Sequence, residues 1–182
     1  MGEPGNNRID GSEYRPEEFR LGIDTPRLDL HNRDEMARVA HALARQARHA
    51  LLLYTRDLDP PIYDQLAFLD AVRHLVRSDR QTPIRILLRD SRRVIQCGHR
   101  LVELALRLRS FIEFRRPNAD YPVPIETFLL ADHCGYLRRP NTCRYAGTAS
   151  FNDSARVAEW RNRFLQVWER SEPDAEIRRL YL

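Results

Sequence analysis

Lysine is absent from this chain of 182 residues, so all 30 of its basic residues are arginines. The chain therefore has no amine to form a Schiff base, to bind nucleotide phosphates from a P-loop, or to act as a desolvated base. A guanidinium stays protonated in proteins, so an arginine binds and polarises anions but transfers no proton near neutral pH. A GC-rich coding bias would replace lysine by arginine in the same way, and the limit on catalysis holds whatever the cause.

Cysteines and long apolar runs are scarce as well. Cys97, Cys134 and Cys143 are odd in number and widely spaced, which indicates free thiols in a reducing compartment. No apolar run approaches the roughly 18 residues needed to cross a bilayer. Residues 1–20 lack the basic start and apolar core of a signal peptide. We therefore expect a cytoplasmic protein without a membrane span.

The positive charge is concentrated in the middle of the chain. Residues 36–116 contain sixteen arginines and eight acids, whereas residues 1–35 contain five arginines and nine acids, and residues 117–182 contain nine of each. A basic bias of this kind attracts polyanions. A set of solvated helix faces would give the same excess, so the charge alone leaves both interpretations open.

Hydrophobic periodicity predicts an α/β fold. Residues 1–33 are mostly polar and are expected to form a mobile or loosely packed arm, and residues 34–182 one domain. In the domain, helices and buried strands alternate as αβαβαβ, which is typical of parallel strands joined by crossover helices. The helices are predicted at about 34–47, 62–77 and 91–109, and the strands at 50–56, 83–90 and 111–116. Antiparallel strands over 125–132, 135–140 and 144–151 follow, with a closing helix at 153–170.

Three short segments near the end of the chain form an ordered pattern. The strand 125–132 reads IETFLLAD, residues 147–150 read GTAS, and the last helix carries Phe164 and Trp168 four residues apart. The pattern resembles the phospholipase D superfamily, in which a strand carries H-x-K-x4-D, a later segment reads G-S-x-N and a helix carries F-x-x-x-W. With the element order, the likeness extends over residues 35–171. It is similar to an uncharacterised family of bacterial proteins with a phospholipase D-like domain, sometimes found beside an acetyltransferase domain.

The same resemblance implies that the catalytic groups are lost. Ile125 stands where the superfamily has its histidine and Thr127 where it has its lysine, whereas Asp132 keeps the aspartate position and Ser150 lies in the glycine-serine segment. In active members the histidine attacks phosphorus and the lysine neutralises the phosphoryl oxygens. Isoleucine cannot attack and threonine brings no charge. Since active members place two half-domains face to face, the resemblance also implies a homodimer.

Polar residues follow the first two predicted parallel strands, where α/β proteins bind ligands. If both strand ends face one pocket, their guanidinium groups would bind a phosphate or carboxylate, helped by the start of the next helix. The candidate anion-binding residues are Arg56, Arg89, Ser91, Arg92 and Arg93. Alternatively, Arg56 and Arg89 pair with the aspartates that follow them, and Ser91 only caps the helix.

The histidines and cysteines give weaker signals. His99 lies on the polar side of its predicted helix and is expected to be exposed. His133, Cys134 and Cys143 form one cluster of three soft ligands, whereas a zinc site uses four. A Cys–His nucleophile pair from the same cluster is not expected, because adjacent strand residues point to opposite faces. We expect neither a metal nor a cofactor.

These observations predict a non-catalytic phospholipase D-like domain that binds a phosphorylated or polyanionic partner, with nucleic acid as one candidate. A second hypothesis is a protein-interaction domain that docks on an enzyme such as an acetyltransferase. A third is a residual phosphodiesterase with a site rebuilt around Thr127, Ser150 and Asp132.

Overall fold

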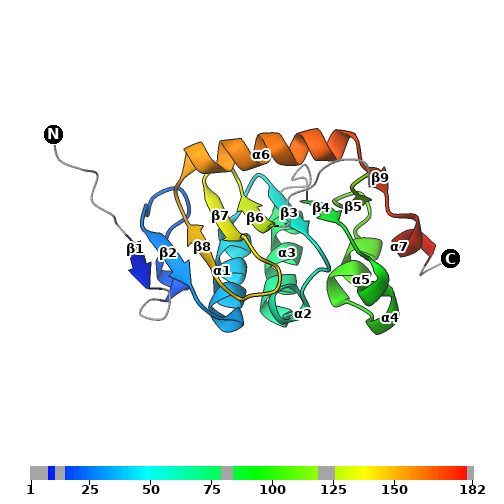
Figure 1. The fold of residues 1–182 in the computed structure, drawn as a ribbon, viewed down its shortest axis with the longest axis horizontal. Helices are drawn as coiled ribbons and strands as arrows, with labels where there is room; N and C mark the ends of the chain where they lie inside the picture. Colours follow the sequence, from blue (N-terminus) through cyan, green and yellow to red (C-terminus); the bar gives the residue numbers. More distant parts are fainter. Residues whose placement is uncertain (1–7, 11–14, 79–83, 119–125, 180–182) are drawn as a thin grey trace.

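The computed structural model describes residues 8–10, 15–78, 84–118 and 126–179. Its central feature is one sheet between two layers of helices (Figure 1). In the described residues the strand order is β1-β2-β8-β7-β6-β3-β4-β5-β9. Helix α6 (Ser154–Glu169) lies across one face of the sheet, and α1, α3 and α5 lie on the other face (Figure 1). The mixed α/β class predicted from the sequence is confirmed.

The first half of the domain forms the parallel part of the sheet. Strands β3, β4 and β5 are parallel neighbours, and α1, α3 and α5 connect or precede them. The αβαβαβ order is therefore confirmed. The strands are β3 (Leu51–Thr55), β4 (Ile84–Leu88) and β5 (Ile112–Arg116), and the helices are α1 (Arg33–Gln46), α3 (Leu66–Ser78) and α5 (Arg100–Arg107).

The second half continues the same sheet with antiparallel strands. β6 (Thr127–Ala131) pairs with β3, β7 (Gly135–Arg139) with β6, and β8 (Gly147–Ser150) with β7. All five side chains of β3 are buried, as are all five of β6. Successive side chains along these strands point to opposite faces of the sheet, so they alternate between two hydrophobic cores, one on each face. The core under α6 is rich in aromatic residues, including Tyr54, Phe128, Tyr136, Trp160, Phe164 and Trp168.

Part of the segment expected to be a loose arm belongs to the sheet. β2 (Arg27–Leu30) pairs antiparallel with β8, and Leu28 and Leu30 are each only 1% exposed. The expectation is therefore wrong for these residues, because two leucines with period-two spacing are enough to build an edge strand when a partner strand is present. β1 (Arg8–Asp10) adds to β2, and a 3-10 turn, η1 (Pro16–Glu18), lies between them. The domain boundary at residue 34 stays a prediction.

Two predicted helices are each divided. The region 62–77 contains α2 (Pro60–Tyr63) and α3, and the region 91–109 contains α4 (Arg92–Cys97) and α5. Gly98, with φ of 75°, ends α4 in a conformation that favours glycine. After α6 the chain forms β9 (Glu172–Pro173), which pairs with β5, and α7 (Ala175–Arg179).

Side chains cap the starts of α1 and α5. Asn32 caps α1, and its side chain accepts the backbone N–H groups of Asp34 and Glu35. His99 is 3% exposed rather than solvated: α4 ends at Cys97, and His99 is the N-cap of α5 instead of a residue on the polar side of one long helix. Its Nδ1 accepts the N–H of Leu101 at 3.2 Å, and its Nε2 lies 2.9 Å from the Leu58 carbonyl oxygen. This geometry requires the neutral tautomer with the proton on Nε2.

Stability is expected to fall as the pH drops from about 7 to about 5. Burial lowers the pKa of His99, so the unfolded chain, with a pKa of about 6.5, binds a proton that the folded state resists. His99 therefore contributes its full stability above about pH 6.5 and loses it as the pH falls toward the depressed folded value. Urea unfolding of His99→Asn, which keeps a capping acceptor but does not titrate, should show a flatter pH dependence than wild type. Equal slopes in the two proteins would contradict the assignment.

Candidate anion-binding site

Two arginines leave the sheet side by side at the carboxyl ends of β3 and β4. Thr55 and Leu88 are partners in the parallel register, and Arg56 and Arg89 directly follow them. Hydrogen bonds from Arg89 N to the Thr55 carbonyl oxygen (3.1 Å) and from Asp90 N to the Arg56 carbonyl oxygen (2.8 Å) extend the pairing beyond the strands. The two loops are thus held against each other by backbone contacts.

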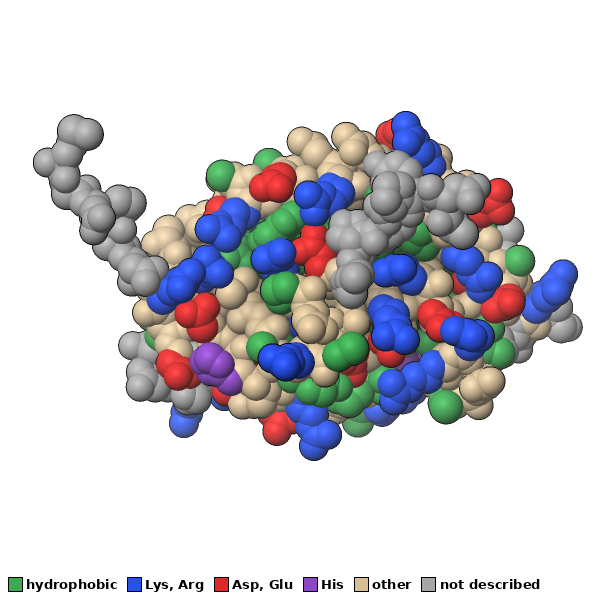
Figure 2. Space-filling model, viewed as in Figure 1, with side chains coloured by type: hydrophobic (Ala, Val, Ile, Leu, Met, Phe, Trp, Pro, Cys, Tyr) green, Lys and Arg blue, Asp and Glu red, His purple; other side chains and the backbone are tan. Residues whose placement is uncertain are grey.

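A cavity of about 560 Å³ opens at this edge. The structure brings four of the five candidate residues together in its lining, so the Arg56 and Arg89 loops share one pocket. The lining is Arg56, Arg89, Asp90, Ser91, Arg92, Arg116, Thr142 and Glu176. Four arginines thus face two carboxylates. Elsewhere, arginines and acids intermingle across the face seen in Figure 2, so charge alone does not single out this cavity.

Arg92 and Arg93 have different roles. Arg92 binds the Asp90 carboxylate through Nε at 2.9 Å and Nη2 at 2.6 Å. These bonds lower the pKa of Asp90 to about 2, so both groups are charged at neutral pH. Arg93 does not line the cavity, and its Nη1 lies 3.7 Å from the Asp57 carboxylate. The structure therefore does not bring Arg93 into the cavity with the other four candidates: from α4 its side chain reaches the preceding loop.

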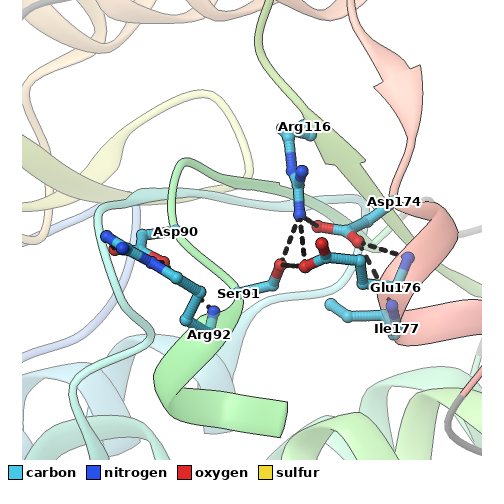
Figure 3. Close-up of polar contacts among 7 residues, drawn as sticks. All are labelled: Asp90, Ser91, Arg92, Arg116, Asp174, Glu176 and Ile177. Atoms are coloured by element: carbon cyan, nitrogen blue, oxygen red, sulfur yellow. Dashed lines mark hydrogen bonds and ion pairs between the residues drawn. The ribbon is translucent and has the colours of Figure 1, made fainter.

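Ser91 belongs to a polar cluster instead of capping a helix. Its hydroxyl makes no capping hydrogen bond to α4, which has only six residues. The hydroxyl accepts a hydrogen bond from Arg116 Nη2 (2.6 Å) and donates one to Glu176 Oε2 (3.1 Å), as Figure 3 shows. Arg116 Nη2 also donates to the same Glu176 oxygen at 2.9 Å. Arg116 and Ser91 bring the pKa of Glu176 below its usual value.

The second carboxylate beside Arg116 is structural. Asp174 is buried, and its Oδ2 lies 3.4 Å from Arg116 Nη2. Its Oδ1 accepts the backbone N–H groups of Glu176 and Ile177 at 3.0 and 3.2 Å, which caps α7. Asp174 thus fixes the C-terminal segment next to the cavity.

The sequence contained a signal for one of the missed lining residues. Arg116 is the last residue of β5, the third parallel strand, so the rule that selected Arg56 and Arg89 also applies to it. Thr142 comes from the β7–β8 connection and Glu176 from α7. Their approach depends on contacts between segments far apart in sequence, which no local pattern predicts.

Thr127, which the resemblance places at the lysine position, belongs to a buried polar cluster. Ile125 lies outside the described residues. Thr127 is 3% exposed, and its hydroxyl has no hydrogen-bond partner in the described part of the chain. Its cross-strand partner is Arg139 on β7, whose Nη1 binds the buried Asp59 carboxylate at 2.6 Å. Tyr145 OH donates to the other oxygen of Asp59 at 3.1 Å. Thr127 is therefore the cross-strand partner of an arginine whose charge Asp59 balances.

The remaining motif residues lie elsewhere. Asp132 follows the far end of β6, about 16 Å from Thr127 at strand spacing, and accepts the backbone N–H groups of residues 48–50. Ser150 lies on β8, two strands from β6, and its hydroxyl accepts the N–H of Asn152 at 3.3 Å. The structure thus does not gather Thr127, Ser150 and Asp132 into one site.

His133, Cys134 and Cys143 each have different surroundings in the structure. His133 stacks on His49 with ring centroids 5.8 Å apart, and burial raises the pKa of the Cys134 thiol. Cys143 is exposed and unbonded to another cysteine. Within the described ranges, no group of three or more His, Cys, Asp or Glu side chains could hold a metal ion.

The architecture is similar to the phospholipase D fold. Three solved structures with this fold are a phospholipase D family member, Nuc, from Salmonella typhimurium (TM-score 0.50, 10% identity), NucT from Helicobacter pylori (0.55, 7%) and phosphatidylserine synthase from Haemophilus influenzae Rd KW20 (0.57, 12%). Nuc aligns with 74% of this chain and 88% of its own, and NucT with 78% and 92%. Phosphatidylserine synthase aligns with 87% of this chain and 41% of its own. TrmBL2, an archaeal chromatin protein with a novel mode of DNA binding, is also similar (TM-score 0.60, 14% identity, 86% of this chain).

Residues 32–180 match the model of a domain of unknown function, DUF7931, and the chain belongs to that family. A search of curated proteins found no significant match. The chain spans 56% of the length of TrmBL2. None of the helices in the described ranges is long and apolar enough to cross a membrane.

Proposed function

We propose that this protein is a non-catalytic phospholipase D-like domain that binds nucleic acid through the phosphate groups of the backbone. The observation that carries the proposal is the cavity at the carboxyl ends of β3, β4 and β5, where four arginines converge. Guanidinium groups bind phosphate oxygens with two parallel hydrogen bonds and do so without reading the base sequence. The similarity of fold to a DNA-binding chromatin protein supports this choice of polyanion.

The non-catalytic part of the proposal rests on chemistry. The chain has no lysine, and the residue at the lysine position is Thr127, whose neighbouring guanidinium is bound to Asp59. We also propose that two copies associate, by analogy with the paired half-domains of the superfamily, and that the protein works in the cytoplasm, where its cysteines would stay reduced. Sedimentation equilibrium tests the first of these: a monomer at micromolar concentration would contradict it.

Replacing both Arg56 and Arg89 by alanine is expected to weaken DNA binding by about tenfold or more at low salt, since each loses a charge-assisted phosphate contact. The plot of log K against log salt should become shallower by about 2, because two fewer counterions are released. Fluorescence polarisation with a labelled oligonucleotide at several salt concentrations measures both quantities.

Arg77→Ala is a control for this experiment that removes one positive charge outside the cavity. Arg77 is exposed near the end of α3, which leads to the amino end of β4, so it lies at the opposite edge of the sheet. Its loss should change affinity little beyond the effect of one unit of net charge. If wild type fails to bind DNA and RNA at low salt, or binds with a flat salt response, the nucleic-acid proposal is wrong.

A further inference from the structure

The C-terminal segment places a carboxylate inside the arginine-lined cavity. β9 pairs with the end of β5, where Glu172 is the partner of Arg116, and α7 follows directly. Glu176 on α7 thereby reaches the cavity wall. A single oxygen, Oε2, accepts hydrogen bonds from both Arg116 Nη2 (2.9 Å) and Ser91 Oγ (3.1 Å), as the dashed lines in Figure 3 show.

This arrangement is that of a bound oxyanion. A guanidinium and a hydroxyl converge on one anionic oxygen, which is how proteins hold a phosphate oxygen. We propose that Glu176 occupies the phosphate position of the Arg116–Ser91 subsite and that a phosphate ligand displaces it. The inference rests on the proposed function, because it names the subsite and the internal competitor of the same cavity.

The two carboxylates next to Arg116 differ in how firmly they are held. The Asp174 side chain is fully buried, whereas the Glu176 side chain is 47% exposed. An exposed ion pair is weak and is screened by salt, so Glu176 can leave Arg116 at little cost. Asp174 stays bound and keeps α7 capped through the N–H groups of Glu176 and Ile177. Displacement therefore needs only a rotation of the Glu176 side chain into solvent, with α7 in place.

A phosphate has the chemistry to replace this carboxylate. It offers more acceptor oxygens than a carboxylate, and a terminal phosphate carries up to twice the charge near pH 7. Arg56, Arg89 and Arg92 line the same cavity and add donors around it. A carboxylate already in the subsite then acts as a selectivity element: anions that are weaker acceptors than Glu176 stay excluded.

The test compares Glu176→Gln with Glu169→Gln, which removes the same charge from an exposed position at the end of α6. Binding is measured by polarisation with two oligonucleotides of one sequence, one with a 5′-phosphate and one with a 5′-hydroxyl, and by competition with inorganic phosphate. Glu176→Gln is expected to bind roughly two- to fivefold tighter than Glu169→Gln, the range for an exposed charge pair. Arg116→Ala in the Glu176→Gln background should abolish the gain.

The outcomes separate this inference from the proposed function. A gain confined to the 5′-phosphorylated oligonucleotide identifies a terminal phosphate as the ligand group, and an equal gain for both identifies backbone phosphates. If wild type binds but Glu176→Gln is no tighter than Glu169→Gln, or if the gain survives Arg116→Ala, the inference is wrong and the proposed function stands. If only Glu176→Gln binds, phosphate does not displace Glu176 in the wild-type protein, and both the inference and the proposed function are wrong. If no protein binds any probe, both fail.

Discussion

Asp59→Ala is expected to lower the free energy of unfolding by about 3–5 kcal/mol, the cost of leaving one member of a buried ion pair without its partner. Asp59 and Arg139 have side chains only 7% and 4% exposed, and their closest contact is 2.6 Å. The substitution leaves the buried Arg139 guanidinium without its carboxylate partner and removes the hydrogen-bond acceptor of the Tyr145 hydroxyl. Urea unfolding followed by circular dichroism measures the loss.

Two further variants make this prediction specific. Asp70→Ala breaks an exposed pair with Arg73 on α3 and should cost less than about 1 kcal/mol. The double variant Asp59→Leu/Arg139→Leu should recover much of the lost stability, because apolar residues of similar size often replace a buried ion pair without loss. An Asp59→Ala protein as stable as Asp70→Ala would show that the pair is open to solvent.

The buried pair lies next to Thr127 in the sheet. Arg139 is the cross-strand partner of Thr127, and Asp59 balances its charge inside the protein. A phosphate would have to break a buried pair to reach it. The arginines at the ends of β3, β4 and β5 line the open cavity on the same edge of the sheet, so the proposed phosphate contacts are assigned to them.

The strands and helices that the sequence predicted well are those whose patterns are long or continuous. β3 and β4 are fully or almost fully buried, so their apolar runs have one interpretation. β2 is only four residues long and reads RLDL, so its two leucines are too short a pattern to predict a strand. The segment becomes a strand because it pairs with β8. The apolar periodicity of residues 91–109 predicted one helix where the structure has two. Periodicity does not detect the positive φ of Gly98, which ends the first of them.

The residues of the candidate site also divide into those that the sequence predicted and those that depend on tertiary contacts. Arg56 and Arg89 could be placed together because parallel strands bring their carboxyl ends to one edge. Glu176 could not, because its approach to Arg116 requires β9 to pair with β5 across more than fifty residues of intervening chain. Burial of an ion pair such as Asp59–Arg139 is equally invisible in sequence, where both residues look like ordinary surface charges.

Asp132→Ala is expected to destabilise the protein by about 3–4 kcal/mol, because three backbone N–H groups lose their acceptor and each such loss costs about 1 kcal/mol or more. Asp132 Oδ1 accepts from His49 N at 2.7 Å, Ala50 N at 3.0 Å and Arg48 N at 3.1 Å. Asp132 also has φ of 54°, which aspartate and asparagine tolerate better than alanine. Urea unfolding again measures the effect.

Asp132→Asn separates this structural role from a catalytic one. Asparagine keeps one acceptor oxygen and tolerates the left-handed conformation, so it should cost about half as much as alanine and leave a folded protein. An alanine variant would lose any activity through unfolding alone, so phosphodiester turnover must be compared in wild type and Asp132→Asn at matched folded fractions. Since Asp132 lies at the far end of β6 from Thr127 and its carboxylate accepts backbone N–H groups there, equal behaviour of the two proteins is expected. Turnover by wild type that Asp132→Asn abolishes while folded would instead assign Asp132 a part in chemistry.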